Sequence, residues 1–148
     1  MISNPIKELE TVLVESGLHA GLVFLNARVV HRWTAVYRLD HSVLRVVDLV
    51  DKLDDKASSR PPDAPLADGF CQFVINHGPF LVTNAKNDVR VISSSYRGPV
   101  VGYVGLPLTR GPVELFGTFC HYDFCAQPVS EEEYLFLHQA ALLLPKFI

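Results

Sequence analysis

The sequence is poor in cysteine, carries little excess charge and contains no long apolar run. Its three cysteines, an odd number, favour a reducing compartment over a disulfide framework, so we expect a cytoplasmic protein. A formal net charge of −3 argues against nucleic-acid binding, because contacts with phosphates need a basic face. The most apolar early stretch, Leu18–Val30, is interrupted by polar residues and is shorter than the roughly 18–20 apolar residues of a membrane span. We therefore expect no nucleic-acid partner and no membrane partner.

The length and composition fit one globular domain. A chain of 148 residues is within the usual size of a single domain, and 49% of apolar residues is ordinary for a soluble protein. We find no internal repeat and no second core. Residues 1–148 are therefore expected to form one domain, with N-terminal helices over residues 1–32.

The densest β pattern lies between Gly98 and Asp123. Two apolar runs, Val100–Leu108 and Val113–Tyr122, flank the turn signal Thr109–Pro112, where glycine and proline favour a chain reversal. Both runs are rich in β-branched and aromatic residues. They predict a long antiparallel hairpin at the middle of a sheet. Positions where another element or a ligand must approach closely are indicated by glycines in these runs, Gly102, Gly105 and Gly117.

Helix-start signals mark both ends of the chain. Asn4-Pro5 is an N-cap followed by proline at the first helical position, and Gly17 is placed to separate this helix from a second one over Leu18–Val30. Alternatively, the two runs form one long bent helix. Near the C-terminus, Ser130 and Glu133 form a capping-box pattern. The helix that follows is expected to run to about Leu144, with an apolar side made of Tyr134, Leu137, Ala141 and Leu142.

The middle of the chain mixes strands, one helix and irregular segments. Alternating patterns predict strands at Thr34–Leu39 and Val43–Leu49, and a short strand at Phe80–Thr83. Leu66–Asn76 is expected to be helical, and Asn84–Arg97 irregular. This order predicts an α+β domain with one central antiparallel sheet and with the first and last helices packed on one face.

A mobile acidic loop is expected over residues 51–65. Between Asp48 and Asp68 six aspartates stand against three cations, which gives −3, the charge of the whole chain. The segment is long for a loop inside a compact domain. It is either a solvated loop or a lid over a pocket.

The ordered set of motifs resembles the GAF domain family. The resemblance covers Trp33 to the C-terminus well, and the earlier helices plausibly. It rests on Phe70-Cys71 with Val74-Ile75, Leu81–Ala85 followed by Asp88–Arg90, Gly98-Pro99, Tyr103–Leu108, and Phe116–Cys120 leading to Asp123. It implies a PAS-like sheet with a ligand pocket between one face and the irregular segment. Members bind cyclic nucleotides, bilins, haem or small metabolites, and many are sensors that dimerise through their terminal helices.

The sequence departs from the specialised members of that family. The cyclic-nucleotide signature is not matched, because Asn84–Asp88 has similar letters at the wrong spacing. Cys120-His121 lies in a strand, whereas the bilin-attaching Cys-His pair lies on a helix. The cysteines Cys71, Cys120 and Cys125 do not reproduce the spacing of the methionine-sulfoxide-reducing members.

The irregular segment is the best candidate ligand site. It has a local charge of +2 within an acidic chain, which suits a small anionic ligand. Alternatively, its charges pair with the acidic loop or face water. The candidate ligand-binding residues are Phe70, Phe73, Asn84, Lys86, Asp88, Arg90, Tyr96, Arg97, Tyr103 and Thr118.

The reactive residues near Cys120–Cys125 have a simpler structural explanation. Side chains alternate along a strand, so Cys120 and His121 face opposite sides and no metal site is predicted. A redox pair of Cys71 with Cys120 or Cys125 is an alternative to inert buried thiols. The histidines look scattered.

These patterns lead to three hypotheses. The first is a non-catalytic small-molecule-binding or signalling module with no predicted cofactor and a possible downstream signalling partner. It would act as a homodimer, which the apolar C-terminal residues Leu142–Ile148 favour. The second is a thiol-dependent reductase of a small oxidised metabolite, as in the methionine-sulfoxide-reducing members. The third is a dimerisation scaffold without a ligand.

Overall fold

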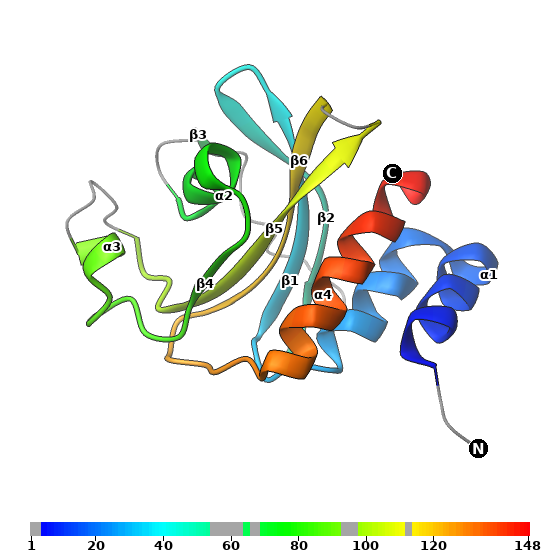
Figure 1. The fold of residues 1–148 in the computed structure, drawn as a ribbon, viewed down its shortest axis with the longest axis horizontal. Coiled ribbons are helices and arrows are strands. Elements are labelled where there is room, and N and C mark those ends of the chain that lie inside the picture. Colours follow the sequence, from blue (N-terminus) through cyan, green and yellow to red (C-terminus); the bar gives the residue numbers. More distant parts are fainter. Residues whose placement is uncertain (1–3, 54–63, 66–68, 93–97, 112–113) are drawn as a thin grey trace.

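A computed structural model of the chain describes residues 4–53, 64–65, 69–92, 98–111 and 114–148. Its centre is a six-stranded sheet in the order β3-β2-β1-β6-β5-β4, and each neighbouring pair is antiparallel. Helices α1 and α4 cover one face of the sheet, and α2 and α3 lie on the opposite side (Figure 1). The predicted α+β architecture and the packing of the terminal helices on one face are confirmed.

Two hairpins form the body of the sheet. They join β1 (Trp33–Asp40) to β2 (Val43–Asp51) and β5 (Gly102–Arg110) to β6 (Glu114–Asp123). All four strands were predicted, with ends that differ by no more than two residues. Gly111 has φ of 66° in the turn after β5, a conformation that glycine adopts easily.

Two short strands complete the edges of the sheet. The predicted strand near Phe80 is β4 (Phe80–Val82), and β3 (Ala64–Pro65) pairs with the start of β2. The predicted bounds of the loop over residues 51–65 are therefore wrong at both ends. Asp51 is the last residue of β2, and residues 64–65 pair with the start of β2. Residues 54–63 lie outside the described part of the chain, and the hypothesis of a lid lies there with them.

The first helix, α1 (Pro5–Asn26), consists of two helical segments joined at a kink, in agreement with the predicted break at Gly17 and with the alternative of one long bent helix. Asn4 caps its start, and Gly17, with φ of 89° and ψ of −176°, makes the kink. The predicted extension to Val30 is wrong. The helix ends at Asn26, whose backbone carbonyl and that of Val29 accept hydrogen bonds from the Lys52 ammonium at 2.6 and 3.1 Å.

The last helix, α4 (Glu131–Leu143), begins as predicted, because the Ser130 hydroxyl accepts a hydrogen bond from the Glu133 amide at 3.1 Å. A 3₁₀ turn, Leu144–Phe147, follows it. The expected burial of Leu142 is wrong, since this side chain is 77% exposed, and Phe136 and Ala140 pack in the core instead.

The C-terminal residues turn back onto the domain. Leu144 is fully buried, and Phe147 and Ile148 pack against the core between the sheet and the terminal helices. Most of the apolar C-terminus is thus covered within the chain. The apolar character of these C-terminal residues therefore no longer supports a dimer by itself.

Helix α2 (Cys71–His77) starts later than the predicted Leu66, since residues 69–70 form a turn and residues 66–68 lie outside the described chain. The segment predicted to be irregular contains one helical turn, α3 (Val89–Ile92). Asp88 starts this turn by accepting a hydrogen bond from the Arg90 amide at 3.0 Å. A carboxylate at a helix start satisfies an amide that has no helical partner.

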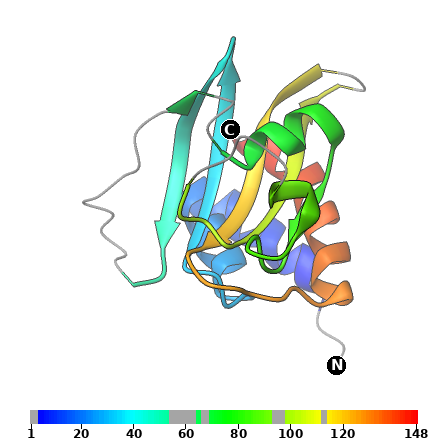
Figure 2. The same cartoon turned by 90° about the vertical axis from the view of Figure 1, so that its left-hand side faces the viewer.

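The sheet separates two hydrophobic cores of different composition. The core under α1 and α4 is made of aliphatic residues and phenylalanines, whereas the core under α2 also contains cysteines and tyrosines. Figure 2 shows the two layers on either side of the sheet. No helix within the described ranges combines the length and the hydropathy of a membrane span.

Candidate functional site

Four buried polar side chains meet beneath α2, and we call them the thiol–hydroxyl cluster: Cys71, Tyr103, Thr118 and Cys120. Cys71 is the first residue of α2, Tyr103 comes from β5, and the other two come from β6. The Cys71 Sγ lies 3.2 Å from the Tyr103 hydroxyl and 3.3 Å from the Thr118 hydroxyl. Both thiols are free and buried. The antiparallel register thus brings groups that are far apart in sequence into one site.

Gly105 makes room for this cluster. It lies opposite Cys120 in the β5–β6 register, and a Cβ at position 105 would overlap the ring and hydroxyl of Tyr103. The Tyr103 ring therefore lies over Gly105, which leaves its hydroxyl in contact with Cys71. The close approach at this glycine thus comes from a side chain of its own strand, whereas another element or a ligand was predicted.

The cluster favours one thiolate over the other. A hydrogen bond from Cys120, with further ones from Thr118 and Tyr103, lowers the pKa of the Cys71 thiol to about 7, although burial opposes this shift. The pKa of Cys120 is raised well above its ordinary value, because its thiol bonds Cys71 and is buried. Burial also raises the pKa of Tyr103 well above its ordinary value. Within the cluster, these hydrogen bonds therefore favour ionisation of Cys71 over ionisation of Cys120.

The third cysteine stands apart. Cys125 lies beyond the end of β6, is exposed, and accepts a hydrogen bond from the Gln127 side chain at 3.4 Å. Of the two pairings considered from the sequence, the fold brings together Cys71 with Cys120 and leaves Cys125 outside the cluster.

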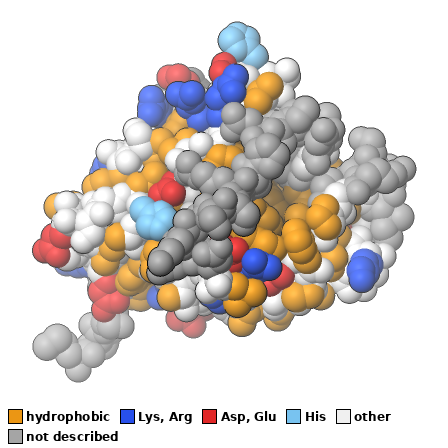
Figure 3. Space-filling view, turned by 180° about the vertical axis from the view of Figure 1, so that it is seen from behind, with side chains coloured by type: hydrophobic (Ala, Val, Ile, Leu, Met, Phe, Trp, Pro, Cys, Tyr) orange, Lys and Arg blue, Asp and Glu red, His pale blue; other side chains and the backbone are white. Residues whose placement is uncertain are grey.

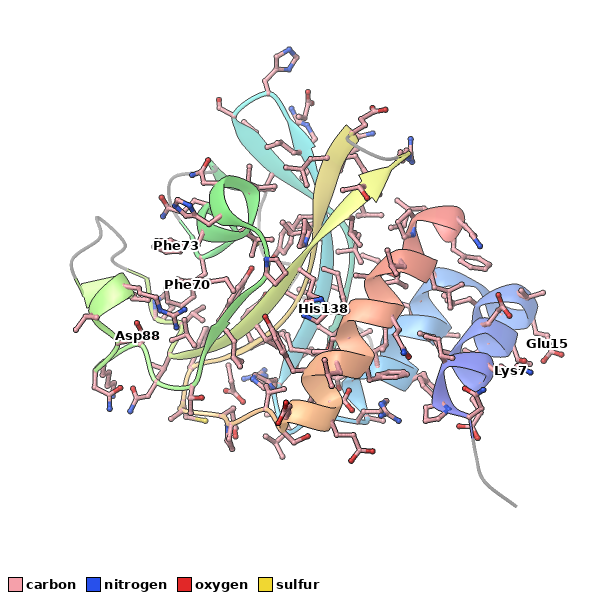
Figure 4. The ribbon with its side chains drawn as sticks, in the orientation of Figure 1. Lys7, Glu15, Phe70, Phe73, Asp88 and His138 are labelled. Carbon is pink, nitrogen blue, oxygen red and sulfur yellow. The ribbon has the colours of Figure 1, made fainter. Side chains whose placement is uncertain are left out.

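Aromatic rings cover the thiol–hydroxyl cluster. Phe73 stacks on Phe80 with ring centres 4.7 Å apart, and Phe70 meets the edge of Tyr103 at 5.3 Å. Phe70 and Phe73 extend from the α2 end of this core, and Asp88 lies farther along, at α3 (Figure 4). Four predicted ligand-binding residues, Phe70, Phe73, Tyr103 and Thr118, are thus brought to one site.

The predicted charged residues form a separate rim. Arg90 bonds both carboxylate oxygens of Asp88, at 3.0 and 2.6 Å, and the carbonyl of Leu81 at 2.6 Å. Its guanidinium also lies 4.5 Å from the centre of the Phe80 ring. Arg90 lowers the pKa of the Asp88 carboxyl through these hydrogen bonds. Arg90 is thus held by Asp88 and is not poised for an anionic ligand.

The remaining predicted residues do not join the cluster. Lys86 is exposed, and its backbone amide donates to the Asn84 side chain at 3.0 Å. Tyr96 and Arg97 lie outside the described residues. Among the described residues, no group of three or more His, Cys, Asp or Glu is arranged to hold a metal ion.

A buried histidine pair was missed by the sequence reasoning. His31 and His121 are both 0% exposed, with ring centres 5.9 Å apart. They lie on the sheet face opposite the cysteines, because His121 follows Cys120 in β6. The alternation of that strand placed His121 correctly, but His31 follows the end of α1, where no periodic pattern fixes a side chain.

Comparison with known proteins identifies the fold. No protein-family model matches the sequence, and no curated protein matches it either. Among solved structures, the GAF domain of the Acinetobacter phosphoenolpyruvate-protein phosphotransferase superposes with a TM-score of 0.74 and 16% identity, over 99% of this chain and 93% of that one.

Enzymes with the same architecture also match. The free methionine-R-sulfoxide reductase of Neisseria meningitidis superposes with a TM-score of 0.71 and 17% identity, over 99% of this chain and 91% of that one. A type II free methionine-R-sulfoxide reductase from Thermoplasma acidophilum gives 0.66 and 16%, over 98% of both chains. At these identities the likeness establishes the architecture alone. The chain has the GAF fold.

Proposed function

We propose that the chain is a non-catalytic sensor module that binds a small organic molecule between α2 and the sheet. The observation that carries this proposal is the difference between the two cores. On the α1 and α4 side, the buried polar groups Asn26, His31, Thr34 and His121 lie together where α1 meets the sheet. The core under α2 instead gathers two thiols and the hydroxyls of Tyr103 and Thr118 beneath aromatic rings. Small-molecule sites are typically apolar with a few convergent polar groups. The free cysteines support a reducing compartment such as the cytoplasm.

The side chains at the site suit a compact, weakly polar ligand with an aromatic or aliphatic body. Phe70, Phe73 and Phe80 offer ring faces and edges to such a body. The hydroxyls of Tyr103 and Thr118 offer hydrogen bonds to one polar group of the ligand. Because Arg90 is held by Asp88, we no longer favour the small anion that the sequence suggested.

The module is proposed to act as a homodimer that communicates with a downstream partner. Large hydrophobic side chains remain exposed on the two terminal helices, Val14 and Val23 on α1 and Leu135 and Leu142 on α4. Exposed apolar residues also gather between charged ones on the face seen from behind (Figure 3). If the terminal helices of two subunits paired, they would cover the exposed side chains on α1 and α4. Ligand binding could then change the relative position of these helices.

Native mass spectrometry of the purified chain tests both parts of the proposal. We expect a dimer whose subunits carry a non-covalent adduct that is lost on denaturation. Tyr103→Phe with Thr118→Val removes two hydroxyls at nearly constant volume and is expected to cut occupancy at least tenfold, since each hydrogen bond contributes about 1 kcal/mol. Tyr134→Phe on α4 is the matched control and should keep the adduct.

Two results would contradict the proposal. A monomer at micromolar concentration argues against the dimer. A bare mass in gently prepared wild-type protein argues against the ligand, and favours the third hypothesis, a dimerisation scaffold without a ligand.

A thiol-dependent reductase of a small oxidised metabolite is the second candidate. The contact between Cys71 and Cys120 favours it, as does the lowered pKa of Cys71, about 7. The similar Neisseria and Thermoplasma proteins are named free methionine-R-sulfoxide reductases. In this reaction the Cys71 thiolate attacks the sulfoxide sulfur, and the oxygen leaves as water after it takes up two protons, one from the Cys120 thiol and one from solvent. The Cys120 sulfur then attacks the Cys71 sulfur, which breaks the Cys71–substrate bond, releases the thioether and leaves the Cys71–Cys120 disulfide.

A coupled assay with free methionine sulfoxide and dithiothreitol as the terminal reductant tests this candidate. Activity should follow the ionisation of Cys71, rise through about pH 7, and vanish in Cys71→Ser. Cys125→Ser is the matched control, because its thiol lies outside the cluster. Activity that survives Cys71→Ser with Cys120→Ser would end this candidate.

A further inference from the structure

The histidine pair, His31 and His121, is buried without the hydrogen bonds that buried polar groups normally have. Both nitrogens of the His31 ring and Nε2 of His121 have no hydrogen-bond partner among the described residues. The remaining nitrogen, Nδ1 of His121, lies 2.6 Å from the Thr34 hydroxyl. Buried polar groups without partners are rare in folded proteins and call for an explanation.

The pair lies at the junction between α1 and the sheet. Asn26, the last residue of α1, donates from its side chain to the Thr34 hydroxyl at 2.8 Å and to the His31 carbonyl at 3.2 Å. Thr34 of β1 lies opposite His121 of β6 in the strand register. Four segments therefore meet here through a continuous set of contacts: the end of α1, the connection to β1, β1 itself and β6.

Charged groups around the junction do little to stabilise a protonated histidine. Asp123 attracts a charge on His31, but Asp123 already accepts hydrogen bonds from the backbone amides of Arg32 and Phe124 and from Gln127. Lys52 repels a charge on either ring. The charged residues where α1 meets α4, Arg28 and Glu133, are paired with each other.

Burial is the main cause of the resulting shift. It lowers the pKa of His31 from 6.5 to about 4, and that of His121 well below its ordinary value. Between pH 6.5 and about pH 4, the unfolded chain therefore binds more protons than the folded chain. Stability contributed by the neutral rings is fully present above pH 6.5 and is lost as pH falls toward about 4.

We propose that the His31–His121 pair is an acid-sensitive latch, which holds the end of α1 against the sheet while both rings are neutral and releases it when they are protonated. A charged imidazole cannot stay in this buried layer beside Lys52 without a partner, so the rings move toward water and the Asn26–Thr34 contacts break. The latch makes the position of α1 depend on pH. It is independent of the ligand proposed beneath α2.

Other titrating groups act in a different pH range or in the opposite direction. Hydrogen bonds lower the pKa of Asp51 and Asp88 below 3.8, so these carboxylates lose their contribution only in stronger acid. Burial raises the pKa of Glu133, and this favours the folded state as pH falls. Comparison of variants therefore isolates the histidines. Since no third metal ligand stands with them in the described ranges, we do not assign the pair to a metal.

Fluorescence of Trp33 reports on the junction through the backbone of β1, because the Trp33 ring itself packs on the opposite face of the sheet, in the core under α2. This residue is the single tryptophan of the sequence, two residues from His31, and its ring lies 5.3 Å from that of Tyr122 and 4.5 Å from that of Phe124. We expect a cooperative change of its emission in the wild type as pH falls from 6.5 toward 4. Hydrogen exchange of residues 26–34 should accelerate over the same range, after correction for the intrinsic pH dependence of exchange.

Leucine replaces histidine at similar volume and cannot be protonated. His31→Leu, and His31→Leu with His121→Leu, are expected to move the fluorescence midpoint down by about one pH unit or more. His77→Leu, at the exposed last residue of α2, is the matched control and should leave the midpoint unchanged. An unchanged midpoint in both latch variants would overturn the proposal.

NMR titration of the wild-type imidazoles keeps the proposal testable if the leucine variants fail to fold. The rings of His31 and His121 should stay neutral until the Trp33 transition begins. If either ring takes up its proton near pH 6.5 while the emission of Trp33 is unchanged, the proposal is wrong.

Discussion

Gly117→Ala is expected to lower the free energy of unfolding by about 3 kcal/mol, the upper end of typical overpacking costs. Gly117 lies in β6 between β1 and β5, opposite Arg38 and Leu108. A Cβ at this position would overlap the backbone carbonyl oxygen of Tyr37. Backbone atoms cannot rotate away as a side chain can, so the central β1–β6 pairing must shift to admit even a methyl group.

Thermal and urea unfolding followed by circular dichroism measure this effect. A loss of this size corresponds to a drop of about 6–12 °C in the melting temperature of a domain of this length. Gly69→Ala is the matched control, because nothing lies within 4 Å of a Cβ at position 69. If Gly117→Ala has the same melting temperature as the wild type, the inferred close approach of β1 and β6 at this position is wrong.

Arg28→Ala is expected to cost about 2–3 kcal/mol, somewhat less than removal of one partner from a fully buried ion pair. The Arg28 guanidinium bonds Glu133 at 2.8 Å and lies 3.9 Å from the centre of the Phe136 ring. The two side chains are only 26% and 11% exposed. The variant leaves the Glu133 carboxylate buried without its partner and removes the packing on Phe136.

The loss should depend on pH in a defined direction. Burial already raises the pKa of Glu133 from 4.5, and Arg28 opposes that shift. Without Arg28 the pKa rises further, so the deficit is small while Glu133 is protonated below pH 4.5 and grows as pH rises. Urea unfolding at several pH values between 4 and 8 tests this sign.

Two further variants give the comparison its controls. Arg28→Leu with Glu133→Leu removes both charges and should recover much of the stability, as a double-mutant cycle would show. Arg45→Ala disrupts the exposed pair with Asp40, whose side chains are 45% and 37% exposed, and should cost at most about 1 kcal/mol. An equal loss in Arg28→Ala and Arg45→Ala would contradict the proposed role of burial.

The sequence by itself determined the elements whose signals are local. Asn4 and Ser130 begin helices because their side chains accept hydrogen bonds from amides only three residues away. The β5–β6 hairpin was predictable because its turn and its strand residues are contiguous. The resemblance to GAF domains, which rests on the order of such segments, correctly predicted the fold. In the structure, Phe70, Phe73, Tyr103 and Thr118 lie in or over the thiol–hydroxyl cluster.

The tertiary structure alone decided which polar groups meet. Glu133 pairs with Arg28, 105 residues away, in place of the local capping bond that its spacing suggested. Strand alternation puts Cys120 and His121 on opposite faces, yet only the docking of α2 brings Cys71 to Cys120, and only the fold of the connection between α1 and β1 brings His31 to His121. A periodic pattern specifies the face of a strand, whereas the partner on that face depends on strand register and helix docking, which local sequence does not encode.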